Sequence, residues 1–288
     1  MDNALELAGD ARSERRGVLS LSAPAAALIT VIVFLPTLWL FGLSFVEGES
    51  FSLAHYQRMI DSSAYFKIFR QTFEISFVVT ALALLLGYPL AYLMSQLPRH
   101  VANLCLVLVF IPFWTSLLVR TYAWLVLLQR KGLINSWLLD LGLVDAPVRL
   151  VHNYTGTVIG MLHIMLPFLI LPTYNALKSI DRTYLLAAAS LGATPARAFW
   201  TVFFPLSMPG VIAGSLLVFI LCLGFYVTPA LLGGGKVTMV SMQIQQNAAL
   251  YFDWGAASAL GVVLLAATIL LLLVVGRSLS LEKMMGGR

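Results

Sequence analysis

Charged residues are scarce in this chain of 288 residues. Only 11% of the residues are Asp, Glu, Lys or Arg, whereas 60% are hydrophobic, and the mean hydropathy is +0.90. A soluble domain carries about a quarter charged residues. The composition therefore excludes an ordinary soluble domain and indicates a polytopic membrane protein. We interpret the net charge of +5 as bias at a lipid surface and expect no binding of nucleic acid.

Residue types that build catalytic or metal sites are also scarce. The two cysteines, Cys105 and Cys222, lie in apolar runs and are interpreted as small core hydrophobes. The four histidines form no H-E-x-x-H pair, and we expect His163 to hydrogen-bond a neighbouring helix. The chain is thus expected to have no catalytic residue, no metal site and no cofactor of its own.

A nucleotide site is also missing. The run GGGK at 233–236 resembles part of a phosphate-binding loop. The full pattern needs Gly at 230 and Ser or Thr after the Lys, where this chain has Ala230 and Val237. We therefore interpret 233–236 as a turn on the periplasmic side.

Long apolar runs are what the chain has in abundance. About 20 apolar residues cross a bilayer, and lipid forces such a run to satisfy its own backbone as a helix. The sequence predicts an all-α bundle of six transmembrane helices: Pro24–Phe45, Phe73–Leu97, Leu104–Leu128, Thr155–Tyr174, Pro209–Leu232 and Ala256–Val275. The transmembrane domain would span 24–276, between an N-terminal tail (1–23) and a C-terminal tail (277–288).

The N-terminal run could be taken for a secretion signal because it follows Arg15 and Arg16. It is too long for a cleaved signal and lacks an A-x-A end, so an uncleaved first helix is favoured. Lys and Arg are slightly more frequent on the side of the termini, which predicts that both termini are cytoplasmic. No internal repeat is visible, which argues against secondary transporters built from inverted repeats.

The loop at 175–208 is the most patterned polar segment. Asp181 is expected to cap a short helix over 182–191, and Gly192 to follow its end. Thr194 and Pro195 then have the order of an N-cap and a first helical residue. Pro205 and Pro209 are expected to interrupt the chain again. A short exposed helix needs a partner surface to be stable.

This loop resembles the cytoplasmic loop of permeases from binding-protein-dependent ABC importers. That family has E-A-A, three residues, Gly, nine residues and then Ile-x-Leu-Pro. This chain departs from it at one position, since Leu186 stands where the family usually has Glu. The residues that correspond to the ATPase-coupling loop are Leu186, Ala187, Ala188, Gly192, Ala193, Thr194, Pro195 and Pro205.

Other segments are similar to the permeases of spermidine/putrescine importers, of the type that forms the first half of a heterodimer. They are IPFWTSLLVRTYAWL (111–125), KGLINSWLLDLGLVDAPVRL (131–150), LPFLILPTYNALKSID (166–181), SMPGVIAGSLLVFI (207–220) and GFYVTPALLGGGK (224–236). The resemblance implies a type I importer fold in a bacterial inner membrane. It also implies a second permease, two copies of an ATPase that binds ATP, and a periplasmic binding protein.

Residues for a substrate passage are less clearly marked. Arg120 is an ionisable group within an expected helix, and such groups are functional candidates. The favoured interpretation is a structural role, in which Arg120 snorkels or pairs near the periplasmic end. Arg120 would also be an unusual lining for a polyamine path. Aromatic faces attract cations but also serve as packing or interface anchors. The candidates are Trp114, Arg120, Tyr122, Trp124, Phe225 and Tyr226.

The cargo that the resemblance implies is a small amino compound. A polyamine is the first interpretation, and an aminophosphonate or another amino compound is the alternative. An ion-driven carrier would need carboxylates inside the membrane, and only Glu74 lies at the start of an expected helix. A membrane enzyme would need a nucleophile or metal cluster, which the sequence does not offer.

Overall fold

The computed structural model describes residues 2–48 and 50–279, and of residues 2–21 it describes the backbone alone. Short strands β1 (Val46–Glu47) and β2 (Ser50–Phe51) form one hairpin, and all other elements are helical. The helices are α1 (Asp2–Leu43), α2 (Ala54–Asp61), α3 (Ser63–Gln96), α4 (Arg99–Phe110), the 3₁₀ turn η1 (Ile111–Trp114), α5 (Leu117–Leu127), α6 (Leu133–Asp140), α7 (Tyr154–Ser179), α8 (Arg182–Ser190), α9 (Pro195–Ala198), the π turn η2 (Phe199–Phe203), α10 (Phe204–Leu223), α11 (Val227–Leu232), α12 (Val240–Ala249) and α13 (Trp254–Leu279).

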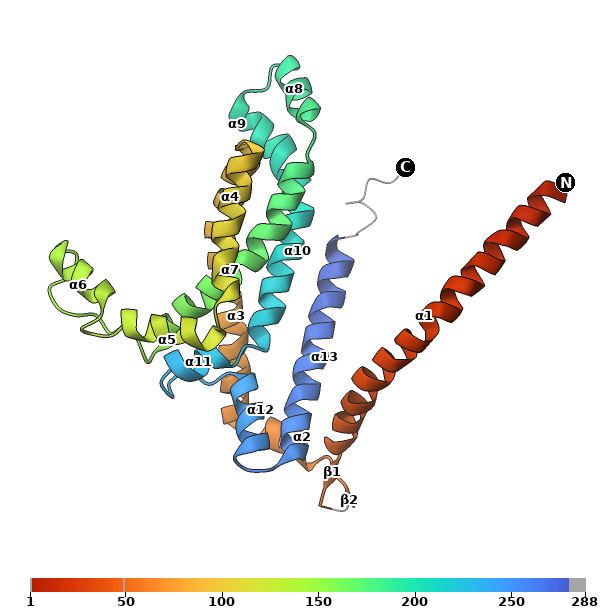
Figure 1. Cartoon of the computed structure of the whole chain (residues 1–288). Coiled ribbons are helices and arrows are strands. Elements are labelled where there is room, and N and C mark those ends of the chain that lie inside the picture. Colours follow the sequence, from red (N-terminus) through yellow and green to blue (C-terminus); the bar gives the residue numbers. More distant parts are fainter. Residues whose placement is uncertain (1, 49, 280–288) are drawn as a thin grey trace.

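The centre of the bundle is α7, which packs against both α3 and α10 (Figure 1). Small residues bring the backbones together, as is usual where lipid removes the hydrophobic drive between helices. The Gly87 backbone of α3 meets the Leu169 side chain, and Gly214 of α10 lies against the Leu169 backbone. Both neighbours of α7 therefore contact the same turn of it.

Five described helical segments are long and apolar enough to cross a membrane, and a bent pair makes up to six. The continuous segments are Ser22–Leu43, Ser63–Gln96, Tyr154–Ser179, Pro195–Leu223 and Trp254–Arg277. The sequence predicted an all-helical bundle with six spans, and this is confirmed when the bent pair is counted as one span. The prediction of one continuous third helix over Leu104–Leu128 was wrong, because the structure has two helical segments there with a bend between them.

The third expected helix is broken at a short segment that holds Pro112, Thr115 and Ser116. Arg99–Trp114 and Leu117–Leu127 meet at an angle of 95°. Pro112 lies in the first residues of η1, and Thr115 and Ser116 adopt extended backbone between the two helices. Proline removes a backbone donor, and the Thr115 amide and hydroxyl both donate to the Pro112 carbonyl, at 3.1 and 2.7 Å, where the helical turn ends. Local chemistry therefore ends the helix.

The helix into α10 begins much earlier than expected. Pro205 and Pro209 were expected to interrupt the chain, but helical structure runs from Pro195 to Leu223 without a gap. The π turn η2 explains this difference. The Phe204 amide donates to the Phe199 carbonyl five residues back, so the helix is already widened where Pro205 lacks a donor.

The same helix also ends earlier than expected. The prediction of a helix to Leu232 was wrong, because α10 stops at Leu223 and Gly224 follows as its C-cap. Phe225 and Tyr226 lie in the break before α11. Gly224 thus marks the start of the break, and helical structure resumes at Val227.

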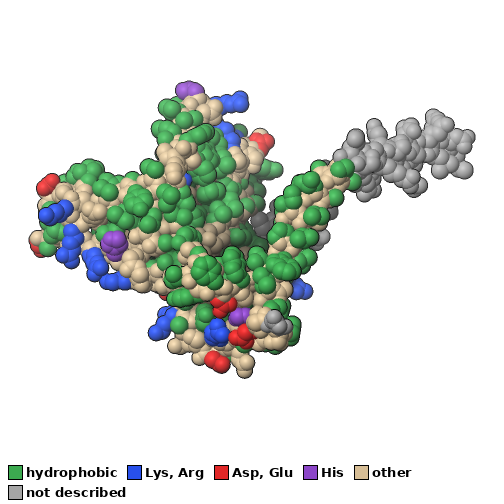
Figure 2. Space-filling view, turned by 60° about the horizontal axis from the view of Figure 1, so that its bottom comes forward, with side chains coloured by type: hydrophobic (Ala, Val, Ile, Leu, Met, Phe, Trp, Pro, Cys, Tyr) green, Lys and Arg blue, Asp and Glu red, His purple; other side chains and the backbone are tan. Residues whose placement is uncertain are grey.

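The flanks of the molecule are apolar and exposed. None of the Ser22–Leu43 window is buried, and only 11% of the window in α13 is buried, against 56% in α7. Figure 2 shows hydrophobic side chains over the visible flank and charged side chains gathered near its extremities. This distribution suits a surface that faces lipid or further membrane helices.

The two ends of the bundle differ in construction. Helices α8 and α9 lie at one end, and the hairpin, α2 and α12 lie at the other (Figure 1). Helix α1 starts at Asp2, so the stretch taken as an N-terminal tail is helical from residue 2 onward. Of the expected C-terminal tail, residues 280–288 lie outside the described residues.

The contact between α7 and α10 predicts a specific weakness at Gly210. A Cβ there would meet the Pro172 carbonyl oxygen at 2.7 Å and the Ala176 side chain. Gly210→Leu should therefore destabilise the protein by about 1–3 kcal/mol through overpacking. The measurement is thermal unfolding in detergent, with Gly261→Leu as control because nothing lies within 4 Å of that position. Equal melting temperatures for the two variants would contradict the packing described.

Candidate functional site

The loop between α7 and α10 begins with a capped helix. The Asp181 carboxylate accepts a hydrogen bond from the Thr183 amide at 2.9 Å and thereby caps α8. This backbone hydrogen bond holds the pKa of Asp181 below its ordinary value of 3.8. The cap is therefore fully present at neutral pH and is lost only as the pH falls through that lowered pKa. The predicted N-cap is confirmed.

A glycine turn ends α8. Gly192 has φ +82°, in the left-handed region that other residues rarely adopt. The Gly192 amide donates to the Ala189 carbonyl at 2.9 Å, and the Ala193 amide donates to the Ala188 carbonyl at 3.0 Å. These bonds satisfy the last carbonyls of the helix. The chain thereby reverses within three residues.

The following helix starts as the sequence predicts. The Thr194 hydroxyl accepts a hydrogen bond from the Arg197 amide at 3.4 Å, and Pro195 is the first helical residue. Seven of the eight expected loop residues thus lie in one helix–turn–helix: Leu186, Ala187, Ala188, Gly192, Ala193, Thr194 and Pro195. Pro205 lies beyond it, near the start of α10.

This helix–turn–helix exposes large apolar side chains. No residue of α8 is buried, and the exposed fraction is 66% for Leu186 and 90% for Leu191. Helix α8 stands at the end of the bundle in Figure 1. An apolar nine-residue helix exposed in this way is not stable alone in water. The described chain leaves this surface uncovered.

Aromatic side chains that the sequence reasoning missed anchor the loop to the bundle. The Tyr92 ring of α3 lies edge-on to Phe199 and Phe203, with centroids 5.4 Å apart in both pairs. Such pairs are each worth about 0.5–1.5 kcal/mol beyond their buried area. The aromatic run at 199–204 was the available signal, but only the fold identifies its partner on α3.

The six passage candidates do not form one cluster. Trp114 is 82% exposed in η1, and Tyr122 is 54% exposed on α5. Phe225 and Tyr226 lie in the break between α10 and α11, where the Ser241 hydroxyl donates to the Phe225 carbonyl at 2.7 Å. Only Arg120 and Trp124, one turn apart on α5, share a helix face.

Trp124 connects α5 to α7. Its indole Nε1 donates a hydrogen bond to Nδ1 of His163 at 3.1 Å, and the two rings meet edge-on. The expectation that His163 bonds a neighbouring helix is confirmed. Because Nδ1 accepts, the neutral ring carries its proton on Nε2. In the described residues no group of three His, Cys, Asp or Glu side chains is arranged to hold a metal.

Arg120 lies beside this pair without an acidic partner. Its guanidinium is 5.9 Å from the Phe113 ring centroid. Nε and Nη1 are buried and have no hydrogen-bond partner among the described residues. A buried guanidinium nitrogen is costly unless it is paired. The single chain leaves this group unsatisfied.

The GGGK segment is a turn. Gly234 and Gly235 have φ +56° and +74°, and the Gln71 side chain accepts from the Thr238 amide at 3.1 Å. A phosphate loop would lead straight into a helix, whereas the next helix here starts at Val240. The interpretation as a turn is confirmed, and Gln71 ties the turn to α3.

Together these features define a helical inner-membrane protein with a helix–Gly–helix loop at one end. The chain belongs to the family described as binding-protein-dependent transport system inner membrane component, which matches residues 19–280. It is therefore a permease component of an ABC importer and not itself an enzyme. Such a permease works with a periplasmic binding protein and with an ATPase on a separate chain.

Curated relatives cover most of the chain. It is 34% identical over 257 residues to PotB of Escherichia coli, a spermidine/putrescine transport system permease protein, covering 87% of this chain and 93% of that protein. It is 26% identical over 250 residues to PhnU of Salmonella typhimurium, whose name assigns it to 2-aminoethylphosphonate transport, covering 83% of this chain and 87% of PhnU.

A solved structure has the same fold. A chain of a bacterial ABC transporter involved in alginate import superposes with a TM-score of 0.70, covering 95% of this chain and 98% of that chain. The two sequences are only 14% identical, so the likeness supports the type I importer fold alone.

The hydrogen bond between Trp124 and His163 leads to a prediction. Trp124→Phe keeps a ring but removes the indole N–H that donates to Nδ1 of His163, so stability should fall by about 0.5–1.5 kcal/mol. Thermal unfolding in detergent measures the change. Trp137→Phe is the matched control, because Trp137 lies 57% exposed on α6. An unchanged melting temperature for Trp124→Phe would show that the bond does not hold α5 against α7.

Proposed function

We propose that this chain is a permease subunit that imports a polyamine, spermidine or putrescine, across the inner membrane. The observation that carries the proposal is the 34% identity to PotB over nearly the whole of both chains. The loop at 175–208 then couples an ATPase to the bundle. Both termini lie in the cytoplasm, on the side of α8 and α9.

The geometry of the loop supports this coupling role. Helix α8 offers an exposed apolar face, and the turn at Gly192 gives α8 and α9 a defined mutual position. Helix α9 continues through η2 into α10, and α8 follows directly on α7. A displacement of α8 by the ATPase is therefore delivered to α7 and α10 at once. This is the two-state element that coupling requires.

Leu186 changes the character of the docking contact. The family usually has Glu at this position, and here an apolar side chain is 66% exposed. We propose that the ATPase facing it contributes apolar surface at this point and that no ion pair forms. The helix–Gly–helix shape, and not charge, then holds the two subunits in register.

The remaining partners follow from what the chain lacks. A second permease, in a heterodimer, would complete the passage, and a periplasmic binding protein would deliver the cargo. The candidate lining groups are Arg120, Trp124 and the exposed aromatics Trp114, Tyr122 and Tyr226. Acidic groups for a polycation would come from the second permease, since Glu74 is the lone acid within the described central helices.

Arg120 favours one second candidate. Its buried, unpartnered nitrogens suit a cargo that carries an anionic group beside its amine. The resemblance to PhnU points to the same class. An aminophosphonate is therefore the alternative cargo for the same importer.

Gly192 provides the test of coupling. A β-branched side chain at φ +82° costs about 1–2 kcal/mol, so Gly192→Val should lower ATP-driven uptake about tenfold while the permease still inserts and the ATPase still turns over. Gly192→Asn should be milder, because Asn tolerates this backbone conformation. Uptake in proteoliposomes and ATP hydrolysis are measured on the same sample.

Gly142→Val is the matched control for this test. Gly142 also has positive φ, +66°, with nothing within 4 Å, but it lies just after α6. It carries a similar backbone strain outside the loop and should leave the ratio of uptake to hydrolysis unchanged. An unchanged ratio of uptake to ATP hydrolysis in Gly192→Val would contradict the proposed coupling role of this loop.

Cargo identity is tested on the complete importer. Uptake of radiolabelled spermidine should require ATP and the binding protein, and excess unlabelled putrescine should reduce it at least tenfold. Excess 2-aminoethylphosphonate should leave it unchanged. Competition by 2-aminoethylphosphonate with no effect of putrescine would support the alternative cargo. Uptake driven by an ion gradient without ATP would contradict both cargo proposals, because each requires an ATP-driven importer.

A further inference from the structure

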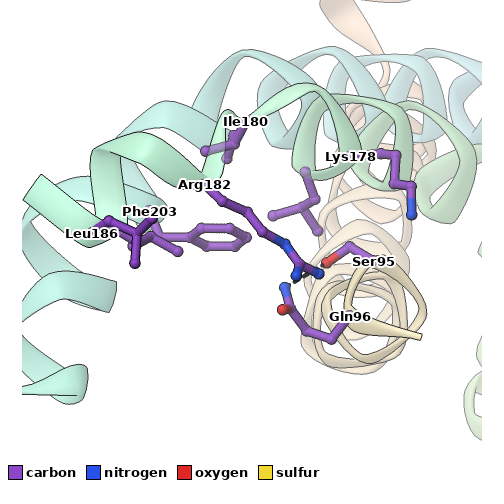
Figure 3. Close-up of a pocket in the computed structure, with 9 residues that line it drawn as sticks. Ser95, Gln96, Lys178, Ile180, Arg182, Leu186 and Phe203 are labelled. Atoms are coloured by element: carbon purple, nitrogen blue, oxygen red, sulfur yellow. Dashed lines mark hydrogen bonds between the residues drawn. The ribbon is translucent and has the colours of Figure 1, made fainter. Parts of the chain in front are cut away.

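A pocket of about 560 Å³ lies behind the helix–Gly–helix loop. It is bounded by the last turn of α3, the last turn of α7 and the first turns of α8 (Figure 3). Its size falls within the roughly 300–1,000 Å³ of pockets that hold small ligands. The end of α3 therefore meets the junction of α7 and α8 around one space.

Two cations and two neutral polar side chains line this pocket. Lys178 and Arg182 supply the positive charge, and no Asp or Glu lies among its described lining residues. The Gln96 amide donates to the Ser95 hydroxyl at 3.1 Å. Figure 3 shows the Arg182 side chain extending toward both residues. The polar side of the pocket is thus rich in donors.

Neither cation is neutralised within the described part of the chain. The ion pairs found there involve Arg58, at the far end of the bundle. Asp181 is adjacent in sequence to Arg182, but its carboxylate caps α8 and forms no ion pair with Arg182 among those of the described residues. Two unpaired cations facing one space attract an anion.

The rest of the wall is apolar. Leu177 and Phe203 are buried, and Ile180, Leu185 and the exposed Leu186 complete this side of the pocket. The position of the pocket is equally informative, because it lies where two membrane-crossing helices, α3 and α7, end. Lipid headgroups are met where such helices leave the hydrocarbon core. A free anion or a lone acidic side chain would leave the apolar wall against water.

We propose that this pocket binds the headgroup of an anionic phospholipid, with the phosphate at Lys178 and Arg182 and the glycerol and upper acyl chain against Leu177 and Phe203. Basic pockets between membrane helices recognise lipids in this way. A lipid held here would bridge α8 to α3 and α7 and so fix the position of the loop. The proposal does not depend on the cargo.

The experiment measures lipid retention by the full chain, co-purified in detergent with its partner subunits. Native mass spectrometry follows added phosphatidylglycerol, phosphatidylcholine or inorganic phosphate. Phosphatidylglycerol should be retained in preference. The double variant Lys178→Gln with Arg182→Gln should weaken its retention about 25-fold, because each basic side chain near an anionic headgroup contributes roughly fivefold.

Two further variants keep the test sharp. Arg130→Gln with Lys131→Gln removes the same charge from the segment between α5 and α6 and should leave retention unchanged. Lys178→Arg with Arg182→Lys keeps the charge and should retain the lipid. Equal retention of the two lipids, or loss in the control as large as in the Lys178 and Arg182 variant, would overturn the proposal.

The remaining arms separate other occupants from a lipid. Retention of inorganic phosphate with no preference between lipids would assign the pocket to a free anion and overturn the lipid. Loss of phosphatidylglycerol whenever the ATPase is bound would assign it to the ATPase. Since no transport is measured, failure here leaves the coupling and cargo proposals untouched.

Discussion

The rest of the structure depends on the close contact of α7 with α3 and α10. In lipid, apolar side chains gain nothing by leaving a solvent as apolar as themselves, so helices associate through tight packing. Gly87 and Gly214 provide it by letting two helices approach Leu169 from different sides. The three helices thus form one rigid unit, and α1 and α13 lie outside it with little burial.

The loop that carries α8 and α9 is linked directly to these three packed helices. Helix α9 runs on through η2 into α10, and only Ile180 and Asp181 separate α8 from α7. Both short helices are therefore linked closely to helices that are already packed together. The contact of Tyr92 with Phe199 and Phe203 adds α3 to the same linkage. Packed cores have discrete arrangements instead of deforming continuously. Under the proposed coupling role, a push on α8 would therefore change how the three helices pack.

Local chemistry was readable from the sequence, and tertiary geometry was not. Asp181, Gly192 and Thr194 act through backbone groups within three residues, so their caps and turn were predicted correctly. The bend after η1 and the unbroken helix through Pro205 depend on neighbouring turns and on a widened π segment. Prolines alone do not distinguish these outcomes, because each removes one donor whether the helix breaks or adapts. The partners of His163 and Tyr92 likewise required the fold.

The charge balance of the chain bears directly on its cargo. Arg120 has buried, unpartnered nitrogens beside Trp124 and His163, and a guanidinium repels a polyamine wherever both lie in a low-dielectric space. A polyamine path along this face is therefore consistent only with an acid from another subunit that neutralises Arg120. An aminophosphonate needs no such acid, since its own anion would serve. The protonated amine of either cargo still finds aromatic faces nearby, so the partner of Arg120, and not the aromatic lining, distinguishes the two cargoes.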